Sequence, residues 1–230
     1  MTVTDIENKL DNFYLGGNTN ENKVELLHPS RNPVVTMDTC EDSEKQVILV
    51  YSALLAAKRY IEKNEQKSNV TMLIVGAHQS GRIAAEYAPK MLAYLTGQVN
   101  VFIADSSIER LMAAEEVCSD VIFWSVDEHE QSLVEKTKGT CKGGADLILD
   151  FIGTPRTIQR AMKILNKGGA FLIGPDALSK VSINLCSLIA QQQSIIGVAE
   201  TNEAVILYDS LLHHLVTSSM QSLTLKDRTT

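Results

Sequence analysis

Two glycines, a histidine and an arginine lie close together directly after a short apolar segment. The order is Gly76-Ala77-His78-Gln79-Ser80-Gly81-Arg82. If a strand ends here and a helix begins, the tight turn points free backbone N–H groups and the positive end of the helix dipole at one spot, which suits a pyrophosphate. Gly76 would allow the turn, and Gly81 would allow the helix to pack closely on the strand.

His78 stands where a phosphate-binding turn of this kind usually has its middle glycine. A side chain at that place removes the easy close approach of the backbone to a phosphate. A charged His78, or Arg82, could offset the loss by hydrogen-bonding the phosphate. By itself the motif is as consistent with an ordinary strand-to-helix turn as with a binding site.

Asp105 ends the next apolar segment, 24 residues after Gly81. A carboxylate at this place accepts hydrogen bonds from the ribose hydroxyls of adenosine and repels a 2′-phosphate. Together with the turn at Gly76, it predicts NAD(H) rather than NADP(H) as cofactor. The other interpretation is a helix N-cap within Asp105-Ser106-Ser107, and the two roles can coexist.

Six short apolar runs follow one another along the chain, and helix-length stretches separate most of them. Parallel strands need crossover connections of that length, so the alternation predicts an α/β fold with a doubly wound, six-stranded parallel sheet. Any single run could instead be a buried helix segment, but six at this spacing favour the sheet. The predicted strands are Thr71–Val75, Val99–Ala104, Val121–Trp124, Leu147–Phe151, Ala170–Ile173 and, at the edge, Ser194–Val198.

The first 42 residues lack sustained periodicity and contain Gly16-Gly17 and two prolines, which predicts an irregular N-terminal arm. After them, Ser43 and Gln46 form a capping pattern that opens a run of helical spacing, so we expect a helix that ends near Asn64. The arm therefore precedes the predicted sheet without belonging to it.

Local signals also mark the crossover helices. Thr154-Pro155 combines a capping residue with proline at the first helical position, and Gly168-Gly169 is expected to form the turn out of the same helix. Pro89 falls inside the first crossover helix. Proline there removes a hydrogen bond and costs about 3 kcal/mol, so we expect a kink or an early end.

Residues 144–155 (GADLILDFIGTP) and 167–174 (KGGAFLIG) resemble the fourth strand, crossover helix and fifth strand of zinc-type alcohol dehydrogenases, in the medium-chain dehydrogenase/reductase superfamily. Residues 194–197 (SIIG) resemble the sixth strand, and the likeness covers about residues 43–215. The resemblance implies a Rossmann fold. It also implies that Ile152-Gly153 and Ile173-Gly174 lie along the nicotinamide end of the cofactor, at the carboxyl ends of the strands.

The resemblance also implies a division of the chain. Residues 1–42 would be a remnant of the catalytic domain, residues 43–215 the NAD(P)-binding domain, and residues 216–230 a C-terminal tail. The family keeps its metal ligands and substrate-protonating groups mainly in the catalytic domain. The arm offers Cys40 and His28 but no set of ligands at the family's spacing. We therefore expect no zinc and assign no catalytic residue.

Three functions are compatible with these features. The first is the NAD(H)-binding domain of an alcohol dehydrogenase-like oxidoreductase that lacks most of its catalytic domain. The second is a non-catalytic NAD(H)-binding or interaction protein derived from the same fold. The third is a methyltransferase that uses S-adenosylmethionine, because its glycine turn and acidic residue look alike. The segment after Gly174 disfavours the third, since such enzymes usually finish with an antiparallel strand pair.

Composition excludes several other classes. The net charge of −7 and the absence of a lysine run argue against nucleic acid, and no window approaches the roughly 20 apolar residues of a membrane span. The polar first residues and scattered cysteines predict a cytoplasmic protein with reduced thiols. Members of the resembled family dimerise through the sixth strand, which implies a homodimer through Ser194–Val198.

Overall fold

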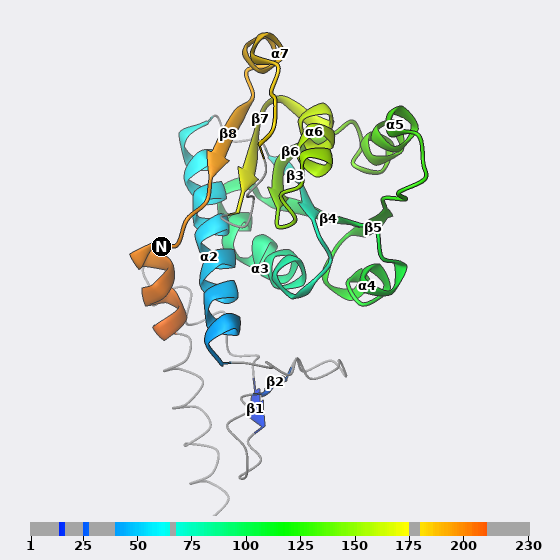
Figure 1. Cartoon of the computed structure of the whole chain (residues 1–230). Helices are drawn as coiled ribbons and strands as arrows, with labels where there is room; N and C mark the ends of the chain where they lie inside the picture. Colours follow the sequence, from blue (N-terminus) through cyan, green and yellow to red (C-terminus); the bar gives the residue numbers. More distant parts are fainter. Residues whose placement is uncertain (1–13, 17–24, 28–39, 65–67, 175–179, 211–230) are drawn as a thin grey trace, which may run out of the picture. The chain divides into compact units, whose positions relative to one another are not determined.

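The computed structural model describes residues 14–16, 25–27, 40–64, 68–174 and 180–210 (Figure 1). The chain divides into two compact units, one of residues 1–48 and 201–230 and the other of residues 49–200. In the first unit, strands β1 (Tyr14–Gly16) and β2 (Glu25–Leu27) pair antiparallel, and residues 202–210 are helical. Of the predicted arm, only these strands and the start of the following helix are described.

The second unit holds a six-stranded sheet in the order β5-β4-β3-β6-β7-β8, with every pair parallel. All six predicted strands are confirmed, and β8 is the edge strand that the sequence predicts. The strand order reverses between β3 and β6, which is where doubly wound sheets leave a crevice at the strands' carboxyl ends. The strands are β3 (Asn69–Val75), β4 (Gln98–Asp105), β5 (Asp120–Phe123), β6 (Ala145–Asp150), β7 (Leu165–Ile173) and β8 (Ser194–Gly197).

Helices cover both faces of the sheet (Figure 1). Successive residues of a strand point to opposite faces. Leu73 and Val75 join a buried cluster with residues of α5 and α6, whereas Ile74 lies against Gly81 of α3. This two-sided burial explains why β3 is almost continuously apolar. The helices are α2 (Cys40–Lys63), α3 (Gln79–Thr96), α4 (Ile108–Met112), α5 (Glu130–Thr140), α6 (Pro155–Ile164) and α7 (Leu185–Ala190), with a 3₁₀ turn η1 at Glu115–Val117.

Two helix boundaries agree with the sequence and one does not. Thr154 caps α6 and Pro155 is its first residue, as predicted. Helix α2 ends at Lys63, close to the predicted Asn64, but it begins at Cys40. The capping pattern at Ser43 therefore lies inside the helix and the predicted start is wrong by about one turn, because serine is tolerated within a helix at a small cost.

The structure differs from what Pro89 and Gly168-Gly169 predicted. Of the kink or early end predicted at Pro89, the early end is wrong, since α3 continues to Thr96 and buries residues on both sides of the proline, including Ala85 and Leu92. Packing on the sheet thus outweighs the lost hydrogen bond. The kink stays a prediction. Gly168 and Gly169 do not form the turn out of α6. They lie within β7, where the pairing with β6 shifts register and Gly168 has φ +70°.

In the described part of the chain, no helix combines the length and the apolar character that crossing a membrane requires.

Candidate functional site

The turn between β3 and α3 has the backbone geometry that the sequence predicts. Gly76 has φ +106°, in the region that favours glycine, and its N–H donates to Ala104 O at 2.8 Å. A Cβ on Gly81 would lie 1.8 Å from Gly76 O, so only glycine allows α3 to approach the turn this closely. The first N–H groups of α3 therefore face the carboxyl end of β3 from close range.

Asp105 binds this turn directly. Its Oδ2 accepts the Ala77 N–H at 2.7 Å, and its Oδ1 accepts the Ser107 N–H at 2.8 Å. Ser107 is the N-cap of α4, so the capping role belongs to Ser107 while Asp105 supports the cap from outside. One carboxylate thus joins the turn after β3 to the helix after β4.

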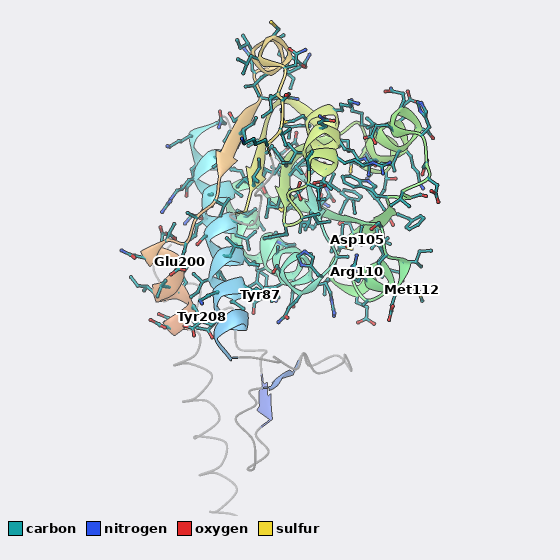
Figure 2. The ribbon with its side chains drawn as sticks, viewed as in Figure 1. Tyr87, Asp105, Arg110, Met112, Glu200 and Tyr208 are labelled. Carbon is teal, nitrogen blue, oxygen red and sulfur yellow. The ribbon has the colours of Figure 1, made fainter. Side chains whose placement is uncertain are left out.

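Arg110 also donates hydrogen bonds to Asp105, a contact that was not predicted from the sequence. Its Nε donates to Oδ2 at 3.2 Å and its Nη2 to Oδ1 at 2.7 Å, and Figure 2 labels both residues. The Asp105 side chain is fully buried, whereas that of Arg110 is 49% exposed. Burial alone would raise the pKa of Asp105, but the hydrogen bonds from Arg110, Ala77 and Ser107 lower it below its ordinary value.

His78 lies at the N-cap of α3, where its side chain makes no capping hydrogen bond. Its Nε2 is 2.9 Å from the place of a Cβ on Gly76, and its ring centroid is 6.3 Å from that of Phe151 in an edge-on arrangement. The imidazole therefore lies between the ends of β3 and β6. It remains open to solvent, yet partial burial lowers its pKa below the ordinary value.

Asp150, the last residue of β6, is a second buried carboxylate that the sequence analysis did not assign to the site. Its Oδ1 accepts the N–H groups of Ile152 and Gly153 at 2.8 and 2.9 Å, and its Oδ2 accepts the Thr157 hydroxyl at 2.8 Å. Burial raises its pKa. Its carbonyl accepts the Gly174 N–H at 3.4 Å, so one residue connects both predicted nicotinamide segments.

The predicted site residues thus gather at the carboxyl ends of neighbouring strands. The strand β3 is followed by Gly76, Ala77 and His78, and β4 ends at Asp105. The strand β6 is followed by Ile152-Gly153, and β7 ends at Ile173 with Gly174 directly after it. Gly81 and Arg82 lie in the first turn of α3.

Two side-chain atoms in that turn, Gln79 Nε2 and Arg82 Nε, are buried and have no hydrogen-bond partner among the described residues. Unpaired buried donors are costly, and phosphate oxygens are acceptors, so this turn fits a bound pyrophosphate. Among the described residues, no group of three or more His, Cys, Asp or Glu side chains could hold a metal ion. The unpaired N–H donors of Gln79 and Arg82 suit an anion.

The all-parallel sheet and its glycine turn define a Rossmann-like α/β domain. Residues 87–213 match the sequence model of a family described as zinc-binding dehydrogenase, and the chain belongs to this family. No curated protein sequence matches the chain significantly.

Solved structures with the same fold are zinc-type alcohol dehydrogenases and their relatives. The alcohol dehydrogenase of Aeropyrum pernix is 22% identical, with a TM-score of 0.59 over 82% of this chain and 52% of its own. A short chain alcohol dehydrogenase from E. coli CFT073, in complex with NADH, is 18% identical, with a TM-score of 0.56 over 83% and 51%. An alcohol dehydrogenase zinc-binding domain protein from Burkholderia ambifaria is 17% identical, with a TM-score of 0.57 over 83% and 48%. The chain spans about half the length of these proteins.

Proposed function

We propose that this chain contains the NAD(H)-binding domain of an alcohol dehydrogenase-like oxidoreductase. The single observation that carries the proposal is the 2.7 Å hydrogen bond from Ala77 N–H to Asp105 Oδ2. This bond joins the proposed phosphate-binding turn after β3 to the carboxylate at the end of β4 that is suited to a ribose. Membership in the zinc-binding dehydrogenase family supports the same conclusion.

Each proposed binding residue has a separate task. The backbone N–H groups at the start of α3 would bind the pyrophosphate, and Asp105 would bind the adenosine ribose. Ile152-Gly153 and Ile173-Gly174 would line the nicotinamide end, where the half-buried isoleucines exclude water. When bound, the dinucleotide would supply hydride transfer. The proposed division of the chain is an arm of residues 1–42, the cofactor domain of residues 43–215 and a tail of residues 216–230.

Arg110 bears on the choice of cofactor. Asp105 already accepts four hydrogen bonds, which is about the capacity of a carboxylate. A ribose hydroxyl would therefore displace one of the Arg110 contacts, and the half-exposed Arg110 is the partner that can swing away. The negative charge of Asp105 then meets the ribose, which favours NAD(H) over the 2′-phosphorylated cofactor.

A binding titration tests the proposal. Trp124, the only tryptophan, follows β5 directly, is buried, and donates from Nε1 to Thr137 Oγ1 at 3.0 Å. We expect NADH to change Trp124 fluorescence and to raise the melting temperature, with weaker binding of NADPH and none of S-adenosylmethionine. Asp105→Asn should weaken NADH binding by about tenfold or more, because a charged acceptor is lost. A response to S-adenosylmethionine alone would refute the proposal.

A non-catalytic dinucleotide-binding protein derived from the same fold is the second candidate. NADH binding without oxidation or reduction of any alcohol or quinone would support it. The methyltransferase alternative fits poorly, since β8 continues the parallel sheet.

We also propose a homodimer through β8. This strand ends the sheet, and α7 just before it exposes Leu185 and Ile189 by 65% and 75%. An open strand edge beside exposed apolar side chains favours pairing with a second copy. A cytoplasmic location, and the lack of nucleic-acid or membrane partners, stay predictions from the sequence.

A further inference from the structure

His78 is placed to contact a ligand that binds at the carboxyl ends of β3 and β6. Its imidazole lies over Gly76 on one side and beside Phe151 on the other, so it lies between the ends of β3 and β6. Gly76 has no side chain, and a Cβ there would lie only 2.9 Å from Nε2. If residue 78 were also a glycine, the space beside Gly76 would be open to a pyrophosphate. In this chain the imidazole of His78 occupies that space.

The groups that face His78 come from three elements. Partial burial is the largest influence and disfavours a proton on the imidazole, as does Arg110 of α4. Asp105 of β4, Asp150 of β6 and the hydrogen bond to the Phe151 backbone stabilise the proton. Asp105 is paired with Arg110 in a two-point ion pair, so the two charges largely cancel at the imidazole. Since burial lowers its pKa from the ordinary value, the ring is mainly neutral at pH 7 in the free protein.

We propose that His78 is a ligand of the pyrophosphate, and that binding of the dinucleotide takes up one proton on its imidazole. This inference rests on the proposed function. A pyrophosphate brings two negative charges to the first turn of α3, where they add to the field of Asp150. An imidazolium donates to phosphate oxygens as a charged group, and the positive end of α3 supports the same anion. The side chain thereby replaces the backbone contact that glycine would have given.

Linkage fixes the sign of the pH effect. If the complex holds a proton on His78 that the free protein lacks, affinity rises as the pH falls through the window between the two pKa values. The dissociation constant changes by up to about tenfold per pH unit in that window. A histidine that only obstructs the phosphate site predicts no such pH dependence, because its protonation gives no gain in affinity. It also predicts that replacing His78 by glycine is enough to allow binding.

Titration calorimetry with NAD⁺ tests the proposal between about pH 5.5 and pH 8. Measurements in buffers of different ionisation enthalpy count the protons taken up on binding. We expect uptake approaching one proton and tighter binding at lower pH. His78→Gln and His78→Gly should both abolish the uptake and the pH dependence. His129→Gln is the matched control, because His129 caps α5 through its own side chain and should leave both unchanged.

The outcomes separate the two proposals. NAD⁺ binding that is independent of pH, or proton uptake that survives in both His78 variants, would overturn the role of His78 and leave the cofactor proposal standing. Proton uptake that survives in both variants would indicate that Asp150, which both variants retain, takes up the proton. If only His78→Gly binds NAD⁺, the imidazole is an obstruction and the inference is wrong. Absence of binding in every variant would overturn the proposed function together with the inference.

Discussion

Gly81 is packed so closely against the turn after β3 that it leaves no room for a side chain. An added Cβ would meet the backbone oxygen of Gly76 at 1.8 Å, so Gly81→Ala must push α3 away from β3. We expect a loss of about 3 kcal/mol or more in the free energy of unfolding. Gly139→Ala is the control, because nothing lies within 4 Å of its Cβ position and alanine favours the helix by up to about 1 kcal/mol. Urea denaturation measures both, and equal effects would contradict the close approach.

The two buried carboxylates of the site should respond to pH in opposite directions. The pKa of Asp105 is lowered in the folded protein, so its contribution to stability is present above about pH 4 and is lost as the pH falls. The pKa of Asp150 is raised, so its contribution is greatest at low pH and is lost as the pH rises through the folded value.

Unfolding curves from about pH 3 to pH 7 check this contrast. Relative to the wild type, Asp105→Asn should be less stable at pH 7 and should converge with it near pH 3. Asp150→Asn should gain on the wild type as the pH rises, because the amide keeps an acceptor for Ile152 and Gly153 without a buried charge. Parallel pH profiles for the two variants would contradict these pKa directions.

At the residue scale, the sequence predicted the turn at Gly76 and the position of Asp105 because both follow from chain order. Arg110 and Asp150 were missed for a physical reason. Their roles arise from side-chain contacts that form only when strands and helices are in place. A cation five residues after Asp105, at the start of a short helix, is the signal that could have revealed Arg110.

Helix α3 keeps a proline in its middle, and this element should gain from its removal. Pro89 has no N–H to donate, while the residues on either side of it are packed on the sheet. Pro89→Ala restores a donor to the carbonyl of Ala85, so we expect a gain of about 1–3 kcal/mol in the free energy of unfolding. Urea denaturation measures the gain. A loss of stability would mean that packing around the proline ring matters more than the missing hydrogen bond.

At the element scale, strands were predicted more accurately than helix ends. The six apolar runs predicted the six strands, because strands that are buried on both faces contain few polar residues. The start of α2 and the behaviour of Pro89 and Gly168-Gly169 depend on tertiary packing instead. Local propensities of about 1–3 kcal/mol are overridden when a helix or strand packs along its length.

At the scale of the whole molecule, the proposed dimer gives a direct prediction. Replacing Ile189 by lysine puts a charge on α7 beside the edge strand, whereas Met112→Lys changes a similarly exposed apolar residue on α4. We expect light scattering to give a dimer mass for the wild type and Met112→Lys, and a shift toward monomer for Ile189→Lys. A monomer mass for the wild type at working concentration would contradict the dimer.

The position of β3 has a consequence for synthesis of the chain on the ribosome. Its first neighbour, β4, ends at Asp105, but its second, β6, ends only at Asp150. When the nascent polypeptide has emerged only as far as β5, the edge of β3 that later pairs with β6 is therefore still exposed. Any pause in translation between β5 and β6 would lengthen that exposure, and a chaperone that covers extended apolar segments would be needed most at that moment.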